Sequence, residues 1–80
     1  MLNFSILSDV REVIMNVIVE IESIEADRIA KQLKSIEKTK WILKNRGLLV
    51  GTKIDTKSIP GLTEFTLKLD PAAVIRIVKQ

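Results

Sequence analysis

The apolar residues between Val10 and Ile21 recur at the spacing of one helical face. They occupy positions i, i+3, i+4, i+7, i+8 and i+11: Val10, Val13, Ile14, Val17, Ile18 and Ile21. All of them are β-branched, which makes a strand the competing interpretation. The polar residues of this stretch also recur at helical spacing, and Ser8 can cap the first turn. The pattern therefore predicts a helix over residues 8–22.

Two more helices are expected before the middle of the chain. Small and apolar residues at helical spacing predict a helix over residues 25–33: Ala26, Ile29, Ala30 and Leu33. Lys34 and Ser35 then form a tight turn, and Ser35 caps a third helix over residues 36–46. Gly47 is the stop expected just after a helix C-terminus.

The second half of the chain combines strand patterns with one helix signal. Two runs alternate between apolar and polar residues and predict strands over residues 48–55 and 63–69. Asp70-Pro71 joins an N-cap to a proline at the first helical position, which predicts a last helix over residues 71–79. The expected fold is a single domain of class α+β, mostly α, with three helices, a two-stranded wing and an additional C-terminal helix.

The composition disfavours several classes of protein, above all enzymes and metal-binding proteins. The chain has 80 residues, of which 46% are hydrophobic, and this content favours oligomerisation. It has no Cys and no His, so the usual thiolate, general base and metal ligands are missing. We therefore expect no enzyme activity, no cofactor and no metal. No apolar run is long enough for a membrane span and no secretion signal is visible, so a cytoplasmic location is expected. The Ile- and Lys-rich composition is typical of thermophile proteins.

Positive charge is concentrated in the middle of the chain. Residues 31–57 contain eight Lys or Arg and two acidic residues, whereas residues 1–30 contain two Arg and six acidic residues. A basic segment of this kind favours a polyanionic partner. The alternative is an ordinary lysine surface facing water.

The order of the expected elements resembles the winged helix-turn-helix superfamily. The resemblance covers "IEADRIAKQLKSIEKTKWILKNRGLLVGTKIDTKSIPGLTEFTLKL", residues 24–69, in which "RIAKQL" is similar to the second helix. "ILKNRGLLV" is similar to the end of the recognition helix and the entry to the wing. The resemblance implies binding to double-stranded DNA by the third helix and the wing, although this superfamily also contains members that bind proteins.

Trp41, the only tryptophan, would point away from the core if residues 36–46 formed a regular helix. Three interpretations remain for it. The indole contacts nucleic acid, it anchors a protein interface, or it packs back onto the N-terminal lead or the last helix.

The prediction from sequence is a DNA-binding transcriptional regulator that forms a homodimer. The predicted DNA contacts are Lys34, Lys38, Lys40, Trp41, Lys44, Asn45, Lys53 and Lys57. The predicted dimer interface is Leu2, Phe4, Val74, Ile75 and Val78. The alternative function is a winged-helix protein-interaction subunit of a larger replication, transcription or remodelling assembly.

Overall fold

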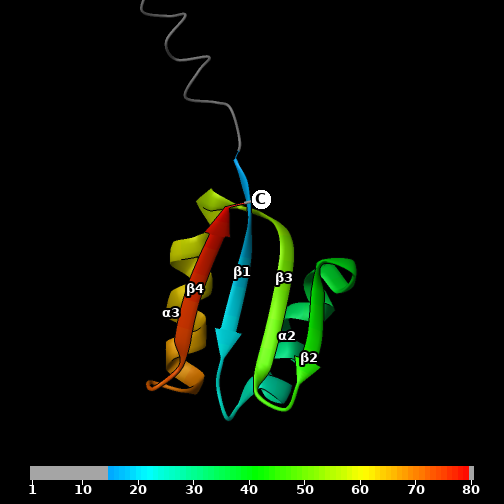
Figure 1. The fold of residues 1–80 in the computed structure, drawn as a ribbon. Coiled ribbons are helices and arrows are strands. Elements are labelled where there is room, and N and C mark those ends of the chain that lie inside the picture. Colours follow the sequence, from blue (N-terminus) through cyan, green and yellow to red (C-terminus); the bar gives the residue numbers. More distant parts are fainter. Residues whose placement is uncertain (1–14, 80) are drawn as a thin grey trace, which may run out of the picture.

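The chain forms a four-stranded antiparallel sheet with two α-helices on one of its faces (Figure 1). The computed structural model describes residues 15–79. Its elements are β1 (Asn16–Glu22), α2 (Ala26–Glu37), η1 (Lys38–Lys40), β2 (Trp41–Asn45), β3 (Leu48–Asp55), η2 (Thr56–Ser58), α3 (Ile59–Leu69) and β4 (Val74–Lys79). The strand order is β2-β3-β1-β4, which with the β-α-β-β-α-β sequence of elements is the ferredoxin-like topology. The winged-helix arrangement expected from the sequence is wrong.

The first expected helix is replaced by strand β1 in the part that the structure describes. Val17, Val19 and Ile21 are buried toward the helices, while Asn16, Ile18, Glu20 and Glu22 point to the other side of the sheet. This period of two is the one that a strand requires. β1 lies between β3 and β4 and pairs with both, so its β-branched residues support a central strand. Residues 8–14 of the expected helix lie outside the described residues.

The second helix is longer than expected and the third is absent from the described residues. α2 continues through Lys34 and Ser35 to Glu37, and the Ser35 hydroxyl donates to the Gln32 carbonyl oxygen at 2.6 Å instead of capping a new helix. Residues 41–45 then form strand β2, which pairs antiparallel with β3. Gly47 does not end a helix but belongs to the tight turn between β2 and β3, where its N–H donates to the Asn45 carbonyl oxygen at 2.9 Å.

In the C-terminal third, the expected strand and the expected helix exchange places. Residues 59–69 form α3 instead of a strand over 63–69, with Pro60 in the first turn, where a missing N–H costs nothing. Residues 74–79 form strand β4 instead of a helix over 71–79. Asp70 accepts hydrogen bonds in the turn before β4 and does not cap a helix. The strand expected over 48–55 is present as β3.

The core lies between the sheet and the two helices. It is formed by the inward residues of the strands and by one side of each helix: Val17, Val19, Ile21, Ile29, Ala30, Leu33, Trp41, Leu49, Ile54 and Leu62. The helices cover this face of the sheet only, as Figure 1 shows from the opposite side. Within residues 15–79, therefore, one face of the sheet is packed against helices and the other face carries no helix.

Candidate binding surfaces

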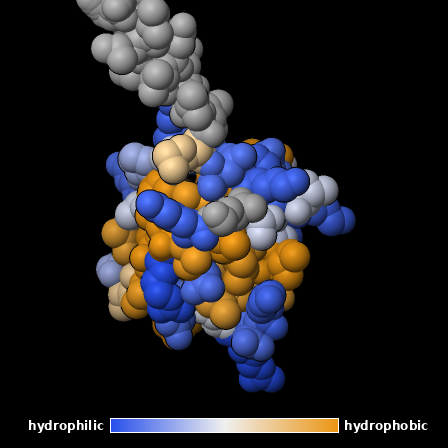
Figure 2. All heavy atoms as spheres, turned by 45° about the horizontal axis from the view of Figure 1, so that its top comes forward, coloured by the Kyte–Doolittle hydropathy of each residue, from blue (hydrophilic) through white to orange (hydrophobic). Residues whose placement is uncertain are grey.

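The first candidate surface is the sheet face that the helices leave uncovered, here called the outer face. It comprises the side chains that alternate away from the core: Ile18, Glu20, Glu22, Ile42, Lys44, Leu48, Val50, Val74, Arg76 and Val78. Ile42, Val74 and Val78 are exposed by 55%, 47% and 43%. Hydrophobic side chains surround hydrophilic ones on this side of the molecule (Figure 2). Several large apolar side chains exposed on one face mark an interaction surface more often than an isolated exposed residue does.

The charged groups at the centre of the outer face are paired within the chain. Arg76 Nε lies 3.2 Å from Glu20 Oε1, and Arg76 Nη1 lies 3.1 Å from Glu22 Oε1. The pKa of Arg76 is raised, first by the hydrogen bond to Glu20 and then by that to Glu22. Glu20 and Arg76 are direct cross-strand partners in the β1–β4 register, which holds the pair in place. The guanidinium therefore bridges two carboxylates across adjacent strands.

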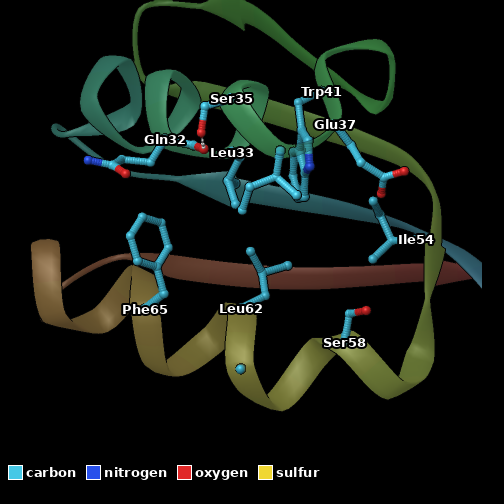
Figure 3. A pocket seen from close by; sticks show the side chains of 11 residues that line it. Gln32, Leu33, Ser35, Glu37, Trp41, Ile54, Ser58, Leu62 and Phe65 are labelled. Carbon is cyan, nitrogen blue, oxygen red and sulfur yellow. Dashed lines mark hydrogen bonds between the residues drawn. The ribbon is translucent and has the colours of Figure 1, made fainter.

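The second candidate surface is a groove between α2 and α3 on the covered side of the sheet (Figure 3). It has a volume of about 450 Å³ and is lined by Gln32, Leu33, Ser35, Ile36, Glu37, Trp41, Ile54, Ser58, Gly61, Leu62 and Phe65. Leu33 and Trp41 face Leu62 and Phe65 across it (Figure 3). The groove, here called the helix groove, is apolar at its base and polar at its rim.

Trp41 is part of the core and not of an exposed basic surface. Its side chain is only 6% exposed and belongs to the core cluster. The indole lies over Gly51 of β3, so it is buried, but not against a last helix as the third interpretation expected, because residues 74–79 form strand β4. The cause is strand alternation, because the first residue of β2 points inward, where its cross-strand partner is Gly51. A Cβ at Gly51 would lie 2.5 Å from the indole ring, so only glycine leaves room for it. The outward position expected from a helical wheel is wrong.

The remaining predicted DNA contacts are spread over the molecule. Lys34 lies on α2, on the helix side of the sheet, whereas Lys44 lies on β2 and alternates to the outer face. Asn45 ends β2, and Lys38 and Lys40 lie in η1, where Lys40 pairs with Glu37 at 3.1 Å. Lys53 lies near the C-terminal end of β3, and Lys57 lies in η2. These cations do not form one surface with Trp41.

The predicted dimer residues fall partly on the outer face. Val74 and Val78 belong to it, while Ile75 points to the core side and packs against the core. All three lie on a strand instead of the expected terminal helix. Leu2 and Phe4 lie outside the described residues. Ile18, Ile42 and Val50 also lie on the outer face and are not among the predicted surface residues. The alternation of residues 16–22 is the signal that would have indicated Ile18.

A third region is polar and connects the loop after β1 with the turn before β4. The Ser23 hydroxyl donates to Asp70 Oδ2 at 2.6 Å, and the Ala72 N–H donates to Asp70 Oδ1 at 3.0 Å. The pKa of Asp70 is lowered, chiefly by the Ser23 hydrogen bond and next by the Ala72 hydrogen bond. These bonds tie the β1–α2 loop to the turn before β4. The arrangement satisfies the carboxylate internally and serves the fold.

Within residues 15–79 no group of three or more acidic side chains is arranged to hold a metal ion. No helix in that range is long and apolar enough to cross a membrane. Comparison of the chain with family models, curated protein sequences and solved structures gives no match. The case for a function therefore depends on the outer face and the helix groove.

Proposed function

We propose that this domain is a protein-interaction module that assembles with a second copy of itself through the outer face. One observation carries the proposal, namely the apolar side chains that flank the paired charges on a sheet face that the described helices leave bare. Each apolar side chain removed from water contributes in proportion to its buried area, about 25 cal/mol per Å². Association is the direct way to remove this face from water.

The charges of the outer face favour a second copy over an unrelated partner. In a two-fold interface both copies present the same patch, so an unpaired charge on one copy would lie near the same charge on the other and be repelled. Arg76 is paired with Glu20 and Glu22 of its own chain, and Lys44 on β2 offsets the remaining negative charge. The patch is therefore neutral and can meet its own copy without like-charge repulsion.

The size of the outer face sets the expected affinity. Four strands about 4.8 Å apart and about six residues long span a footprint of roughly 20 Å by 19 Å. Stable specific interfaces bury about 800 Å² of accessible surface on each partner, about twice that footprint. We therefore expect a weak, reversible dimer and not a permanent one.

Sedimentation equilibrium of the full chain between about 1 µM and 1 mM tests the proposal. The wild-type mass should rise from 9.0 kDa towards twice that value as concentration increases. Ile42→Lys and Val78→Lys should each keep the chain monomeric, because a lysine in the interface loses its hydration. The matched control is Ile36→Lys, since Ile36 is 78% exposed and lies on α2, on the side of the sheet opposite the outer face.

A wild-type mass of 9.0 kDa at every concentration would overturn the proposal. So would dimerisation that survives both outer-face variants. A titration with labelled duplex DNA at two salt concentrations tests the alternative partner, nucleic acid, which the charge pattern of the sequence favours. Salt-sensitive binding of the monomeric form, unaffected by Val78→Lys, would favour nucleic acid as the partner instead.

A further inference from the structure

The helix groove separates the facing sides of α2 and α3 on the covered side of the sheet. We infer that it is the docking site of this chain's own residues 1–14, here called the N-terminal segment, which precede β1. The apolar side chains of the segment would lie between the two helices, against Ile36, Leu62 and Phe65. This contact goes beyond the proposed self-association, because the outer face lies on the other side of the sheet.

The groove is an unfilled part of the helix layer. α2 lies behind β2 and β3, and α3 lies behind β4, so their facing sides border the groove (Figure 1). Ile36 on the α2 side is 78% exposed, and Phe65 on the α3 side is only partly buried. The groove has a volume of about 450 Å³, whereas a cavity of about 150 Å³ holds one benzene ring. It therefore has room for about three large apolar side chains.

The N-terminal segment joins the described chain beside the groove. The Thr56 N–H donates to the Met15 carbonyl oxygen at 3.1 Å, which holds the residue before β1 against the start of η2. Ile54 and Ser58, each two residues away from Thr56, line the groove. η2 then leads directly into α3 on the helix side of the sheet. The segment therefore starts at the rim of the groove.

The segment is also long enough to cover the groove. α3 has 11 residues and is about 16 Å long at 1.5 Å per residue. Residues 1–14 would span about 21 Å when wound as a helix and up to about 46 Å when extended. Because the segment is tethered at the rim, it meets the groove at an effective concentration on the order of millimolar. A separate ligand of equal affinity would need that concentration to compete, which favours the chain's own segment as the occupant.

The sequence of the segment supplies the apolar side chains that the groove can bury. At 100° per residue, one helical arc of about 120° contains five of them: Ile6, Leu7, Val10, Val13 and Ile14. The charged Asp9, Arg11 and Glu12 fall outside this arc and could stay in water. Among the residues that line the groove only Glu37 is charged, and it is paired with Lys40 at 3.1 Å. An apolar segment can therefore enter without burying an unpaired charge.

Two substitutions in the full chain test the contact by urea titration followed by Trp41 fluorescence. Val10→Asn changes the centre of the apolar arc, and Ile36→Lys changes the α2 side of the groove. Each should lower the unfolding midpoint by about 1 M, because each removes an apolar side chain from the contact. Without the contact Ile36→Lys would be neutral or stabilising, since Ile36 is exposed and a cation near the C-terminus of α2 is favourable. The matched control Ser8→Asn, outside the arc, should leave the midpoint unchanged.

The double variant Val10→Asn/Ile36→Lys distinguishes one shared contact from two unrelated effects. Its midpoint should fall little further than that of either single variant, because the first substitution already releases the segment. A fall equal to the sum of the two single effects would overturn the inference. An unchanged midpoint in either single variant would do the same.

Nuclear Overhauser contacts in the wild-type chain locate the segment without any substitution. The ring protons of Trp41, the only tryptophan, should show contacts to methyl groups of residues 6–14. In an equimolar mixture of labelled and unlabelled chains, these contacts should stay within one chain at every concentration. Their absence would overturn the inference, and contacts between chains would place the segment of a second copy in the groove and overturn it too. The sedimentation test of the outer face does not depend on either result, so the two proposals can fail separately.

Discussion

Replacing Gly51 by alanine tests the position of Trp41, on which both the core and the helix groove depend. The added Cβ would lie 2.5 Å from Cζ3 and 2.7 Å from Cε3 and Cη2 of the Trp41 ring. Carbon atoms in contact normally lie about 3.5–4.0 Å apart. The ring must therefore move by about 1 Å, either against its core neighbours or toward the helix groove that it lines.

The expected cost of Gly51→Ala is about 2 kcal/mol. Overpacking a core costs about 1–3 kcal/mol, and expelling an aromatic ring costs more, whereas exchanging glycine for alanine returns about 0.4–1 kcal/mol through the unfolded state. With a urea m-value of about 1 kcal/mol per M for a chain of this size, the unfolding midpoint should fall by about 2 M. Urea titration followed by Trp41 fluorescence measures this directly, and the native emission of the variant should shift to longer wavelength.

Gly47→Ala is the matched control in the same β2–β3 hairpin. Its Cβ would lie 3.4 Å from the Ser23 carbonyl oxygen, an ordinary contact, so its stability should stay within about 0.5 kcal/mol of the wild type. If Gly51→Ala proved as stable as Gly47→Ala and kept the emission of the wild type, the indole would not lie over Gly51. The burial of Trp41 over Gly51 would then be wrong.

Two further variants test the interior and the loops. Thr66 is fully buried, and its hydroxyl has no hydrogen-bond partner among residues 15–79. Thr66→Val should therefore raise the free energy of unfolding, measured by urea titration, by about 1 kcal/mol. A loss of stability would show that the hydroxyl does have a partner. For Asp70 the pKa in the folded state is lowered, so its contribution to stability is present above the ordinary pKa of 3.8 and is lost as pH falls below it. Ser23→Ala removes the largest cause of that shift, and its melting temperature should fall less steeply than that of the wild type between pH 5 and about pH 2; parallel curves would contradict the assignment.

Parts of the fold could be predicted because local signals agreed with the tertiary structure. The alternation over residues 48–55 corresponds to β3, and the spacing of Ala26, Ile29, Ala30 and Leu33 corresponds to the buried side of α2. In both segments the polar residues separate the apolar ones clearly. Only one period fits such a pattern, so a single segment contains enough information.

Other segments satisfied two periods at once. Leu62, Phe65, Thr66 and Leu69 follow the helical spacing of α3, yet Phe65, Leu67 and Leu69 also alternate like a strand. Pro60 suits the first turn of α3, but a proline is equally common in the loops between strands. The choice between helix and strand also determined the position of Trp41. A helix over residues 36–46 would turn the indole outward, whereas strand β2 turns it inward.

The amino-acid sequence by itself determined which residue types are available: no cysteine or histidine chemistry, many β-branched residues and an excess of apolar side chains for a small chain. Tertiary structure decided where they lie. Glu20 pairs with Val50 on one side and with Arg76 on the other, partners far away in the chain, and these long-range pairings make residues 16–22 a strand. The physical reason is that an apolar run rich in Val and Ile can bury itself in either conformation, so hydrogen bonds and packing from distant segments determine the outcome.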